Sequence, residues 1–304
     1  MENNYKAFPP GWNNIRVPTH AKRATLAGIA TYTPCLPKGI WGQRVAWGLV
    51  SLGGAKLLPG RAGSWNPPFA GDGWQELLEQ LRAIVGDFDS HTVYERRRLR
   101  SGLMMLLLQG DTPVGFVKAR ELPGEGMIRE EAALHLAAQA GPKSFEVPRV
   151  LGAGEVTGWR YLVTTAMPPR MHRMVEGRPR PELLGDITEA LSALERPPDV
   201  PDHWQPFHGD FTPWNLRQFG EGRPWLIDWE DCGYAPPGAD DVLYLATAFA
   251  IGKTLAPIPL EASEAVEYWW AEMNRRIREK LEWGLELRQL DHGLLEALAA
   301  GAPE

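Results

Sequence analysis

The sequence has few cysteines and no long hydrophobic run. Cys35 and Cys232 are the only two cysteines among 304 residues, which argues against a disulfide framework and against a cysteine-based zinc site. The most apolar early segment, residues 45–58, is interrupted by three glycines and Lys56, so it is too short to span a bilayer. The N-terminus lacks the basic and then apolar pattern of a signal peptide. We therefore expect a cytoplasmic protein without a membrane span.

An excess of positive charge is also lacking. The chain has 32 lysines and arginines against 38 aspartates and glutamates, a formal net charge of −6, whereas nonspecific nucleic-acid binders usually carry a basic surface. The one dense basic run, residues 96–100, is interpreted as a solvated face of a strand or helix. We therefore expect no nucleic-acid partner, and the sequence does not indicate an oligomeric state.

Residues 1–90 are rich in proline, glycine and tryptophan. Patterns typical of helices occur only at residues 41–58 and 72–86, and Asp72 is predicted to cap the second helix. Exposure of the many tryptophans would leave a large apolar patch, and a segment with this much proline and glycine is too short to bury a stable core alone. We interpret residues 1–90 as an N-terminal extension that docks onto the rest of the chain. An independent partner-binding or membrane-surface segment is the alternative.

The remaining chain changes from strands to helices. Apolar runs predict strands, and apolar residues spaced by three and four predict helices. The predicted strands are residues 103–108, 114–119, 147–151 and 160–165, and the predicted helices are residues 127–140, 182–195, 239–251 and 261–283. Strands dominate residues 91–166 and helices dominate residues 167–304. This division predicts an α+β fold of two lobes.

Two segments in the second half combine residues suited to phosphoryl transfer. The first is His-Gly-Asp-Phe-Thr-Pro-Trp-Asn at residues 208–215, and the second is Leu-Ile-Asp-Trp-Glu at residues 226–230. Transfer from ATP needs a carboxylate to orient the acceptor hydroxyl and hard oxygen ligands for Mg²⁺. Asp210 can be that carboxylate. Asn215 and Asp228 can bind the metal if a hairpin brings them together.

The first segment resembles the HGDxxxxN catalytic loop of aminoglycoside phosphotransferases, choline kinases and homoserine kinases. The second resembles the Ile-Asp-Trp-Glu motif of the same family, and residues 233–242 are similar to its Gly-x-Pro-x-x-Asp-Leu segment. The resemblance covers about residues 91–250. It implies a bilobal protein-kinase-like fold, with a small β-rich N-lobe (residues 91–166) that binds the nucleotide and a helical C-lobe (residues 167–304) that binds the acceptor.

The resemblance also implies roles for residues of the second half. Asp210 would orient and deprotonate the acceptor hydroxyl, and Asn215 and Asp228 would bind Mg²⁺. His208 would buttress the loop rather than transfer a proton. Asp241, with Asp240 as the near alternative, would form hydrogen bonds with the backbone of the loop.

In the first half, the resemblance implies a nucleotide site. Lys118 would pair with the α- and β-phosphates of ATP, and its carboxylate partner would be Glu130 or Glu131. Glu130 is preferred, because it shares the inward face of its helix with Leu134 and Ala137. In the hinge, the backbone of residues 164–167, including Thr165 and Met167, would bind the edge of adenine.

One part of the family pattern is missing. A glycine-rich phosphate loop is expected near residues 96–102, where only Gly102 occurs, so the phosphate-covering residues stay unassigned, with Arg100 or Ser101 as a guess. The short stretch after Asp228 leaves little room for a peptide-binding segment. We therefore predict an ATP- and Mg²⁺-dependent kinase for a small hydroxylated acceptor, such as an aminoglycoside, a sugar, choline or a related metabolite. A catalytically silent nucleotide- or partner-binding protein is the alternative, disfavoured because all four polar residues of the motifs are present (Lys118, Asp210, Asn215 and Asp228).

Overall fold

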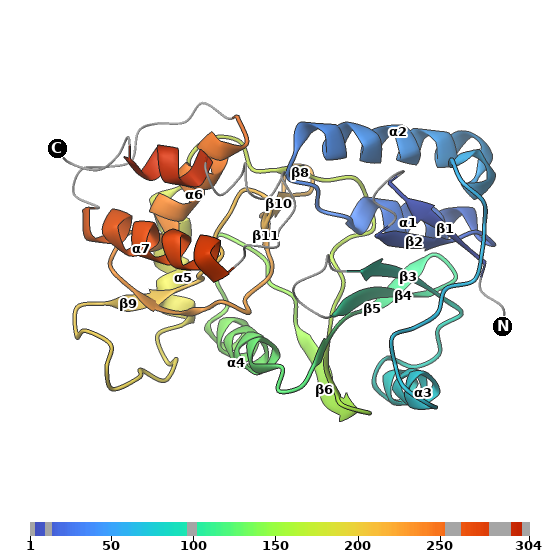
Figure 1. Cartoon of the computed structure of the whole chain (residues 1–304), viewed down its shortest axis with the longest axis horizontal. Coiled ribbons are helices and arrows are strands. Elements are labelled where there is room, and N and C mark those ends of the chain that lie inside the picture. The colour runs from blue at the N-terminus through green and yellow to red at the C-terminus, as the bar shows by residue number, and fades with distance from the viewer. Residues whose placement is uncertain (1–3, 10–13, 96–101, 253–262, 280–292, 300–304) are drawn as a thin grey trace. The chain divides into compact units, whose positions relative to one another are not determined.

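The computed structural model describes residues 4–9, 14–95, 102–252, 263–279 and 293–299 (Figure 1). The chain divides into two compact units. The first contains Met1–Met127 and Pro148–His172, and the second contains Ile128–Val147 and Arg173–Glu304. The basic run at residues 96–100 and the guess of Arg100 or Ser101 as a phosphate-covering residue lie outside the described residues.

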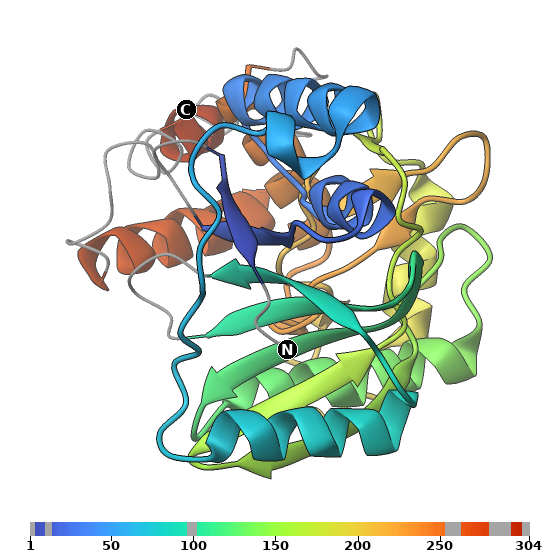
Figure 2. The ribbon, with the colours of Figure 1, turned by 90° about the vertical axis from the view of Figure 1, so that its right-hand side faces the viewer.

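The first unit is built around an antiparallel sheet of seven strands in the spatial order β1-β2-β3-β4-β5-β7-β6 (Figure 2). The strands are β1 (Tyr5–Phe8), β2 (Ile15–Pro18), β3 (Ser90–Glu95), β4 (Leu103–Gln109), β5 (Thr112–Glu121), β6 (Val150–Val156) and β7 (Trp159–Thr164). β4 and β5 confirm the strands predicted at residues 103–108 and 114–119, and they pair with each other as an antiparallel hairpin. Met104 of β4 lies opposite Lys118 of β5.

Helices cover both faces of this sheet, as Figure 2 shows. α1 (Lys22–Thr31) and α2 (Pro37–Gly53) pack on one face, and α3 (Gly73–Val85) packs on the other. The side chains of β4 alternate between the two cores. Its core residues on the α3 side are Leu103, Met105 and Leu107, and those on the opposite side are Leu106 and Leu108. A strand buried on both faces needs apolar residues at every position, which explains the continuous apolar run.

The start of the chain extends the sheet. β1 pairs with β2, and Ile15 of β2 lies opposite Tyr94 of β3. Lys6 is buried in β1, and its Nζ donates hydrogen bonds to the carbonyls of Lys56 at 3.1 Å and Leu58 at 2.6 Å. The sequence did not predict these two strands. Each is only four residues long, and β2 contributes to the core through its contacts with α1 and β3.

One local prediction about α3 is wrong. Asp72 precedes the helix, but its side chain forms no capping hydrogen bond. The first turn of α3 is instead closed by a backbone hydrogen bond, which the amide of Glu76 donates to the carbonyl of Asp72 at 3.0 Å.

The second unit is mainly helical, and its described residues also form two small sheets, one of three strands and one of two. Its helices are the larger part of α4 (Glu125–Ala140), α5 (Pro181–Ala190), α6 (Ala239–Ala250), α7 (Ser263–Glu279) and the helical residues 293–299. Its strands are β8 (Arg173–Met174), β9 (Gln205–Phe207), β10 (Leu216–Gln218), β11 (Trp225–Leu226) and β12 (Gly233–Ala235). α6, α7 and residues 293–299 share a core around Trp269. Within the described ranges, no helix is long and apolar enough to cross a membrane.

Candidate active site

Two pairs of short strands hold the loop of residues 208–215. β9 precedes the loop and pairs with β12, while β10 follows the loop and pairs with β11. The β10–β11 pairing continues into a hydrogen bond from the Ile227 amide to the Asn215 carbonyl at 3.1 Å. The predicted hairpin is therefore present, and it returns the chain to Asn215 one residue before Asp228.

Gly209 shows how tightly the loop is packed. Its φ is +80°, and a Cβ on this residue would overlap the backbone carbonyl of Asp231. A left-handed backbone without room for a side chain is a position that only glycine fills without strain. The glycine therefore lets the segment after Asp228 lie directly against the residue that precedes Asp210.

Asp240, and not Asp241, anchors the backbone of the loop. One carboxylate oxygen of Asp240 accepts a hydrogen bond from the His208 amide at 2.8 Å, and the other accepts one from the Gly209 amide at 3.2 Å. Burial raises the pKa of Asp240 to about 7, and these two bonds oppose the rise. Asp241 instead forms an ion pair with Arg178. The preference for Asp241 was wrong, because its side chain points to a different neighbour.

Asp210 and Asn215 lie next to each other across the loop. Asn215 Nδ2 donates to the carbonyl of Asp210 at 2.9 Å and to its Oδ2 at 2.8 Å. Both amide hydrogens are thus directed at Asp210, so Oδ1 is the atom that Asn215 can offer to a metal ion. Burial raises the pKa of Asp210 well above its usual range, and the carboxylates of Asp228 and Asp231 raise it further, while Arg276 and the bond from Asn215 lower it.

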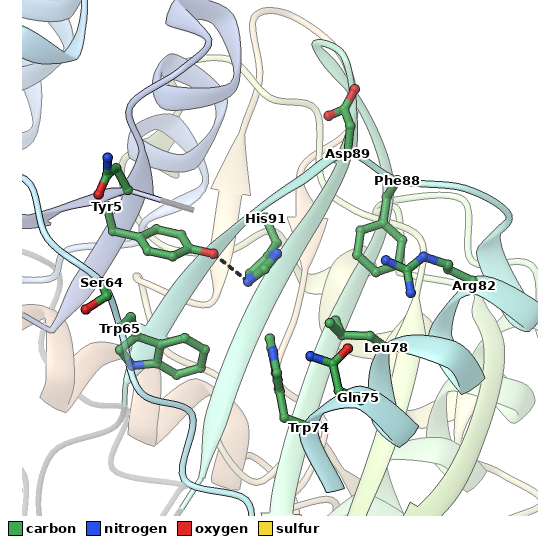
Figure 3. Close-up of a pocket in the computed structure, with 11 residues that line it drawn as sticks. Tyr5, Ser64, Trp65, Trp74, Gln75, Leu78, Arg82, Phe88, Asp89 and His91 are labelled. Atoms are coloured by element: carbon green, nitrogen blue, oxygen red, sulfur yellow. Dashed lines mark hydrogen bonds between the residues drawn. The ribbon is translucent and has the colours of Figure 1, made fainter. Parts of the chain in front are cut away.

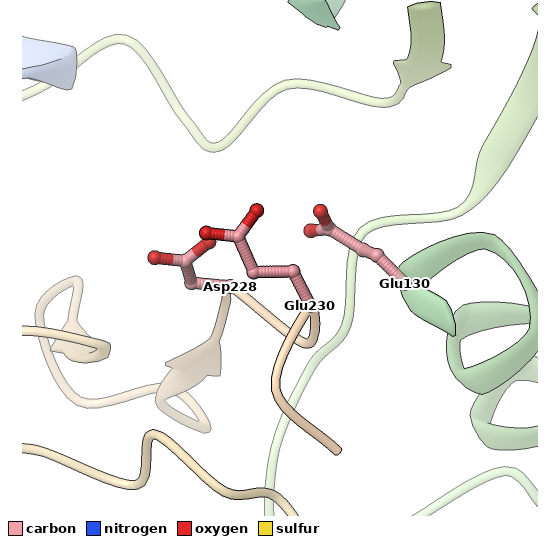
Figure 4. Close-up of side chains that lie close together, drawn as sticks. All are labelled: Glu130, Asp228 and Glu230. Carbon is pink, nitrogen blue, oxygen red and sulfur yellow. The ribbon is translucent and has the colours of Figure 1, made fainter. Parts of the chain in front are cut away.

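Three carboxylates converge beside this loop (Figure 4). One oxygen each of Glu130, Asp228 and Glu230 lies within 4.8 Å of the others. Glu130 comes from α4 and is 3% exposed, while Asp228 and Glu230 come from the segment that follows β11. Asp228 has a φ of +69°, a left-handed conformation that is uncommon for residues other than glycine and tolerated by aspartate.

The cluster also has the chemistry of a cation site. Three anionic groups held this closely repel one another in a partly buried setting. Hard oxygen donors of this kind are the ligands that Mg²⁺ prefers, and the amide oxygen of Asn215 belongs to the same class. The residues therefore fit a divalent cation.

His208 packs as a structural residue. Its ring is fully buried and lies 4.6 Å from the ring of Trp229, and its Nδ1 accepts a hydrogen bond from the Asp210 amide at 3.3 Å. Trp229 is also fully buried and donates from Nε1 to the Leu226 carbonyl at 3.1 Å. These contacts support the buttressing role that was preferred for His208.

The other predicted nucleotide residues belong to the first unit. Lys118 lies in β5, is 9% exposed and alternates with the core residues Val117 and Ala119, so it lies on the opposite face of the sheet from them. Thr165 and Met167 directly follow β7. The Thr165 amide already donates to the Arg149 carbonyl at 2.8 Å, so Thr165 can offer adenine only its own carbonyl. The pairing of Lys118 with Glu130 stays a prediction.

The sequence analysis missed Arg276, a charged residue close to the loop. Arg276 lies in α7, donates from Nε to Glu272 at 2.6 Å and stacks over Trp269 at 5.6 Å. Its positive charge acts on both Asp210 and Asp231. The amphipathic pattern of α7 predicted the helix but gave no signal that distinguished this arginine from its neighbours.

Comparisons with known proteins agree with the motifs. The model of the phosphotransferase enzyme family matches residues 171–269, which include the loop of residues 208–215 and the Asp228 segment. No protein of curated function matches the chain in sequence. The family match confirms the resemblance that the sequence motifs carry.

Solved structures agree with the fold. A spectinomycin phosphotransferase in complex with ADP and spectinomycin superposes with a TM-score of 0.52 at 11% identity, covering 75% of this chain and 98% of its own. An aminoglycoside-3′-phosphotransferase of type VIII gives 0.41 at 20% identity, with coverage of 74% and 98%. A protein from Haemophilus somnus, named as a candidate fructosamine-3-kinase, gives 0.43 at 13% identity, with coverage of 74% and 97%. The first of these similarities confirms the α+β, kinase-like fold class with a β-rich part and a helical part.

Proposed function

We propose that this chain is an ATP- and Mg²⁺-dependent phosphotransferase that moves the γ-phosphate to a hydroxyl of a small molecule. The observation that carries the proposal is the arrangement around the loop within the second unit. Asp210 is hydrogen-bonded to Asn215, and the backbone hydrogen bond from Ile227 to Asn215 brings the Asp228 segment alongside. A carboxylate for the acceptor and oxygen ligands for a metal thus lie within one rigid framework, which is what phosphoryl transfer requires.

The loop residues have separate tasks in this proposal. Asp210 accepts a hydrogen bond from the acceptor hydroxyl and takes its proton as the oxygen attacks the γ-phosphorus, while the bond from the γ-phosphorus to the β–γ bridging oxygen breaks and ADP leaves. The surroundings raise the pKa of Asp210, chiefly through burial, and a raised carboxyl pKa suits a base that works near neutral pH. Asn215 fixes the orientation of Asp210 through Nδ2, and the bonds from the loop backbone to Asp240 keep the loop from shifting.

The cation site in this proposal consists of Asn215 Oδ1 and the carboxylates of Asp228 and Glu230. Mg²⁺ bound there would neutralise phosphate charge and orient the triphosphate. Glu130 adds a third carboxylate to the cluster, and Lys118 is the ammonium proposed to pair with the phosphates. A divalent cation bound there would oppose the mutual repulsion of the three carboxylates.

A compact acceptor suits the short connection after Asp228. β12 begins at Gly233 and pairs at once with β9, and α6 begins at Ala239. This leaves no segment there long enough to seat a peptide substrate. The charges that act on Asp210 include the negative charge of Asp231 and the positive charge of Arg276. Because both signs are present, the described residues do not restrict the acceptor to a polycation.

The test is ADP release with Mg²⁺ and ATP against a panel of aminoglycosides, sugars and choline, using wild type, Asp210→Asn and the exposed control Asp202→Asn. We expect acceptor-dependent ADP release from wild type and Asp202→Asn, and a loss of about 10²–10⁴-fold in Asp210→Asn with nucleotide affinity retained. Turnover of Asp210→Asn within a few-fold of wild type would remove Asp210 from the mechanism. Tight nucleotide binding without turnover of any acceptor would favour the silent binding protein.

A further inference from the structure

The first unit contains a cavity of about 470 Å³ that none of the proposed catalytic roles uses. It lies among the start of β1, residues 64–65, α3 and the start of β3 (Figure 3). Its volume falls in the range of small-molecule sites. The residues that line it include four with aromatic six-membered rings, Tyr5, Trp65, Trp74 and Phe88.

The aromatic wall of the cavity is held in place by hydrogen bonds and ring contacts. Trp65 donates from Nε1 to Glu95 at 2.7 Å, and the rings of Trp65 and Trp74 meet edge to face with centroids 5.3 Å apart. Elsewhere in the cavity lining, the Tyr5 hydroxyl and His91 Nε2 form a hydrogen bond of 2.7 Å. Rings that are already ordered lose little conformational freedom when a ligand binds. Trp65 and Trp74 are only half-buried, so part of each indole faces the cavity.

Among the described residues, Arg82 and Asp89 are the charged side chains that line the cavity. Arg82 lies on the cavity wall with its guanidinium 5.1 Å from the centroid of the Phe88 ring. Among the described residues, none forms an ion pair with Arg82. Asp89 also lines the cavity, but its Oδ2 accepts a hydrogen bond from the Gly110 amide at 2.8 Å. A guanidinium without a carboxylate partner is suited to pair with a carboxylate or phosphate.

His91 also lines the cavity. Burial, and to a lesser extent the positive charges of Arg82 and His20, lowers the pKa of His91 to about 4. His91 itself is neutral at pH 7 and leaves Arg82 as the charged group that can attract an anion.

We propose that this cavity binds a small planar aromatic acid. The ring of the ligand lies against Trp65 and Trp74, and its anionic group pairs with the guanidinium of Arg82. The indole faces supply apolar and stacking contacts, while the arginine selects against neutral and cationic analogues. This site is independent of the proposed phosphotransfer, since none of its residues belongs to the loop or to the carboxylate cluster.

The test is isothermal titration calorimetry of the full-length protein with three probes of similar size. These are 1-naphthoate (aromatic and anionic), 1-naphthylmethylamine (aromatic and cationic) and cyclohexanecarboxylate (anionic and not aromatic). The variants are Arg82→Gln, Arg82→Lys and Trp74→Leu. Glu79→Gln is the matched control, because Glu79 is an exposed residue of the same helix outside the cavity. Thermal unfolding of each variant checks that it is folded.

We expect saturable binding of 1-naphthoate to wild type and to Glu79→Gln. Loss of a charge-assisted pair corresponds to a weakening of about 10- to 100-fold in Arg82→Gln, and Arg82→Lys should retain most of the affinity. Trp74→Leu should weaken 1-naphthoate by at least about tenfold. Equal affinity of wild type and Arg82→Gln for 1-naphthoate would overturn the proposal. Equal or tighter binding of the cationic probe, or of the non-aromatic acid, would overturn it as well.

Discussion

Removing the Asp240 carboxylate should damage the loop of residues 208–215 more than removing any nearby acid. In Asp240→Ala, the amides of His208 and Gly209 lose their acceptors, and His208 is fully buried. A buried donor left without an acceptor costs about 1–3 kcal/mol, so the two together cost about 2–6 kcal/mol. Asp240→Asn keeps one acceptor oxygen but turns its NH2 group towards the other amide donor, so it should cost at least as much as one unsatisfied donor, about 1–3 kcal/mol.

The expected loss of stability is confined to the loop of residues 208–215, so it should be measured at the loop. Because the chain divides into two compact units, two-state unfolding cannot be assumed, and a single unfolding midpoint is a poor measure of a local loss. Hydrogen exchange of the amides of His208 and Gly209 reports directly on the two bonds. We expect their protection to fall strongly in Asp240→Ala and partly in Asp240→Asn. Acceptor-dependent turnover should fall by about 10- to 100-fold in Asp240→Ala, because Asp210 moves with the loop.

Asp241→Ala is the matched control for this prediction. Asp241 lies in the same first turn of α6 and is buried to the same degree, but it pairs with Arg178. Its removal should leave the exchange of the His208 and Gly209 amides unchanged. If Asp240→Ala and Asp241→Ala gave the same exchange and the same turnover, the anchoring role of Asp240 would be refuted.

Two further predictions follow from the cation site and from the buried histidine. Asp228→Ala should weaken binding of Mg·ATP far more than binding of metal-free ATP, because it removes a charged ligand; equal losses in calorimetry with and without Mg²⁺ would indicate a structural role. The pKa of His91 is about 4 in the fold against 6.5 unfolded, so the stability it contributes is present above about pH 6.5 and is lost as pH falls towards 4. The loss amounts to at most about 3 kcal/mol, and thermal unfolding at pH 7.5 and pH 5 should show a smaller acid loss in His91→Gln than in wild type.

Local sequence patterns predicted the strands and helices whose residues are buried in a regular pattern. The run at residues 103–108 predicted β4, since five of these six residues are buried and Met104 is partly buried. The 3.6-residue period of α4 placed Glu130 on the same face as Leu134 and Ala137, and all three are buried. The hairpin expected between Asn215 and Asp228 is present as well, since β10 and β11 pair antiparallel within this short segment.

The start of the chain shows where local patterns stop. β1 and β2 are four residues each, and β1 contains the charged residue Lys6. A short segment with a charged residue is typical of the protein surface. The lysine is accommodated because two carbonyls from residues 56 and 58 accept hydrogen bonds from its Nζ. Those carbonyls lie about fifty residues further along the chain, so no window around Lys6 contains the information that makes it a strand residue.

Asp240 and Asp241 show most clearly what a motif leaves open, because the motif identified both residues as candidates for anchoring the loop and the preferred one was wrong. Consecutive residues of a helix point about 100° apart, so only one of the two can face the loop. Which one does so depends on the rotation of α6 about its axis, which its buried residues set through packing against α7 and residues 293–299. That rotation is a property of the assembled core, and a short motif carries no record of it. The same reasoning applies to Arg276, whose proximity to Asp210 follows from how α7 lies against the same core.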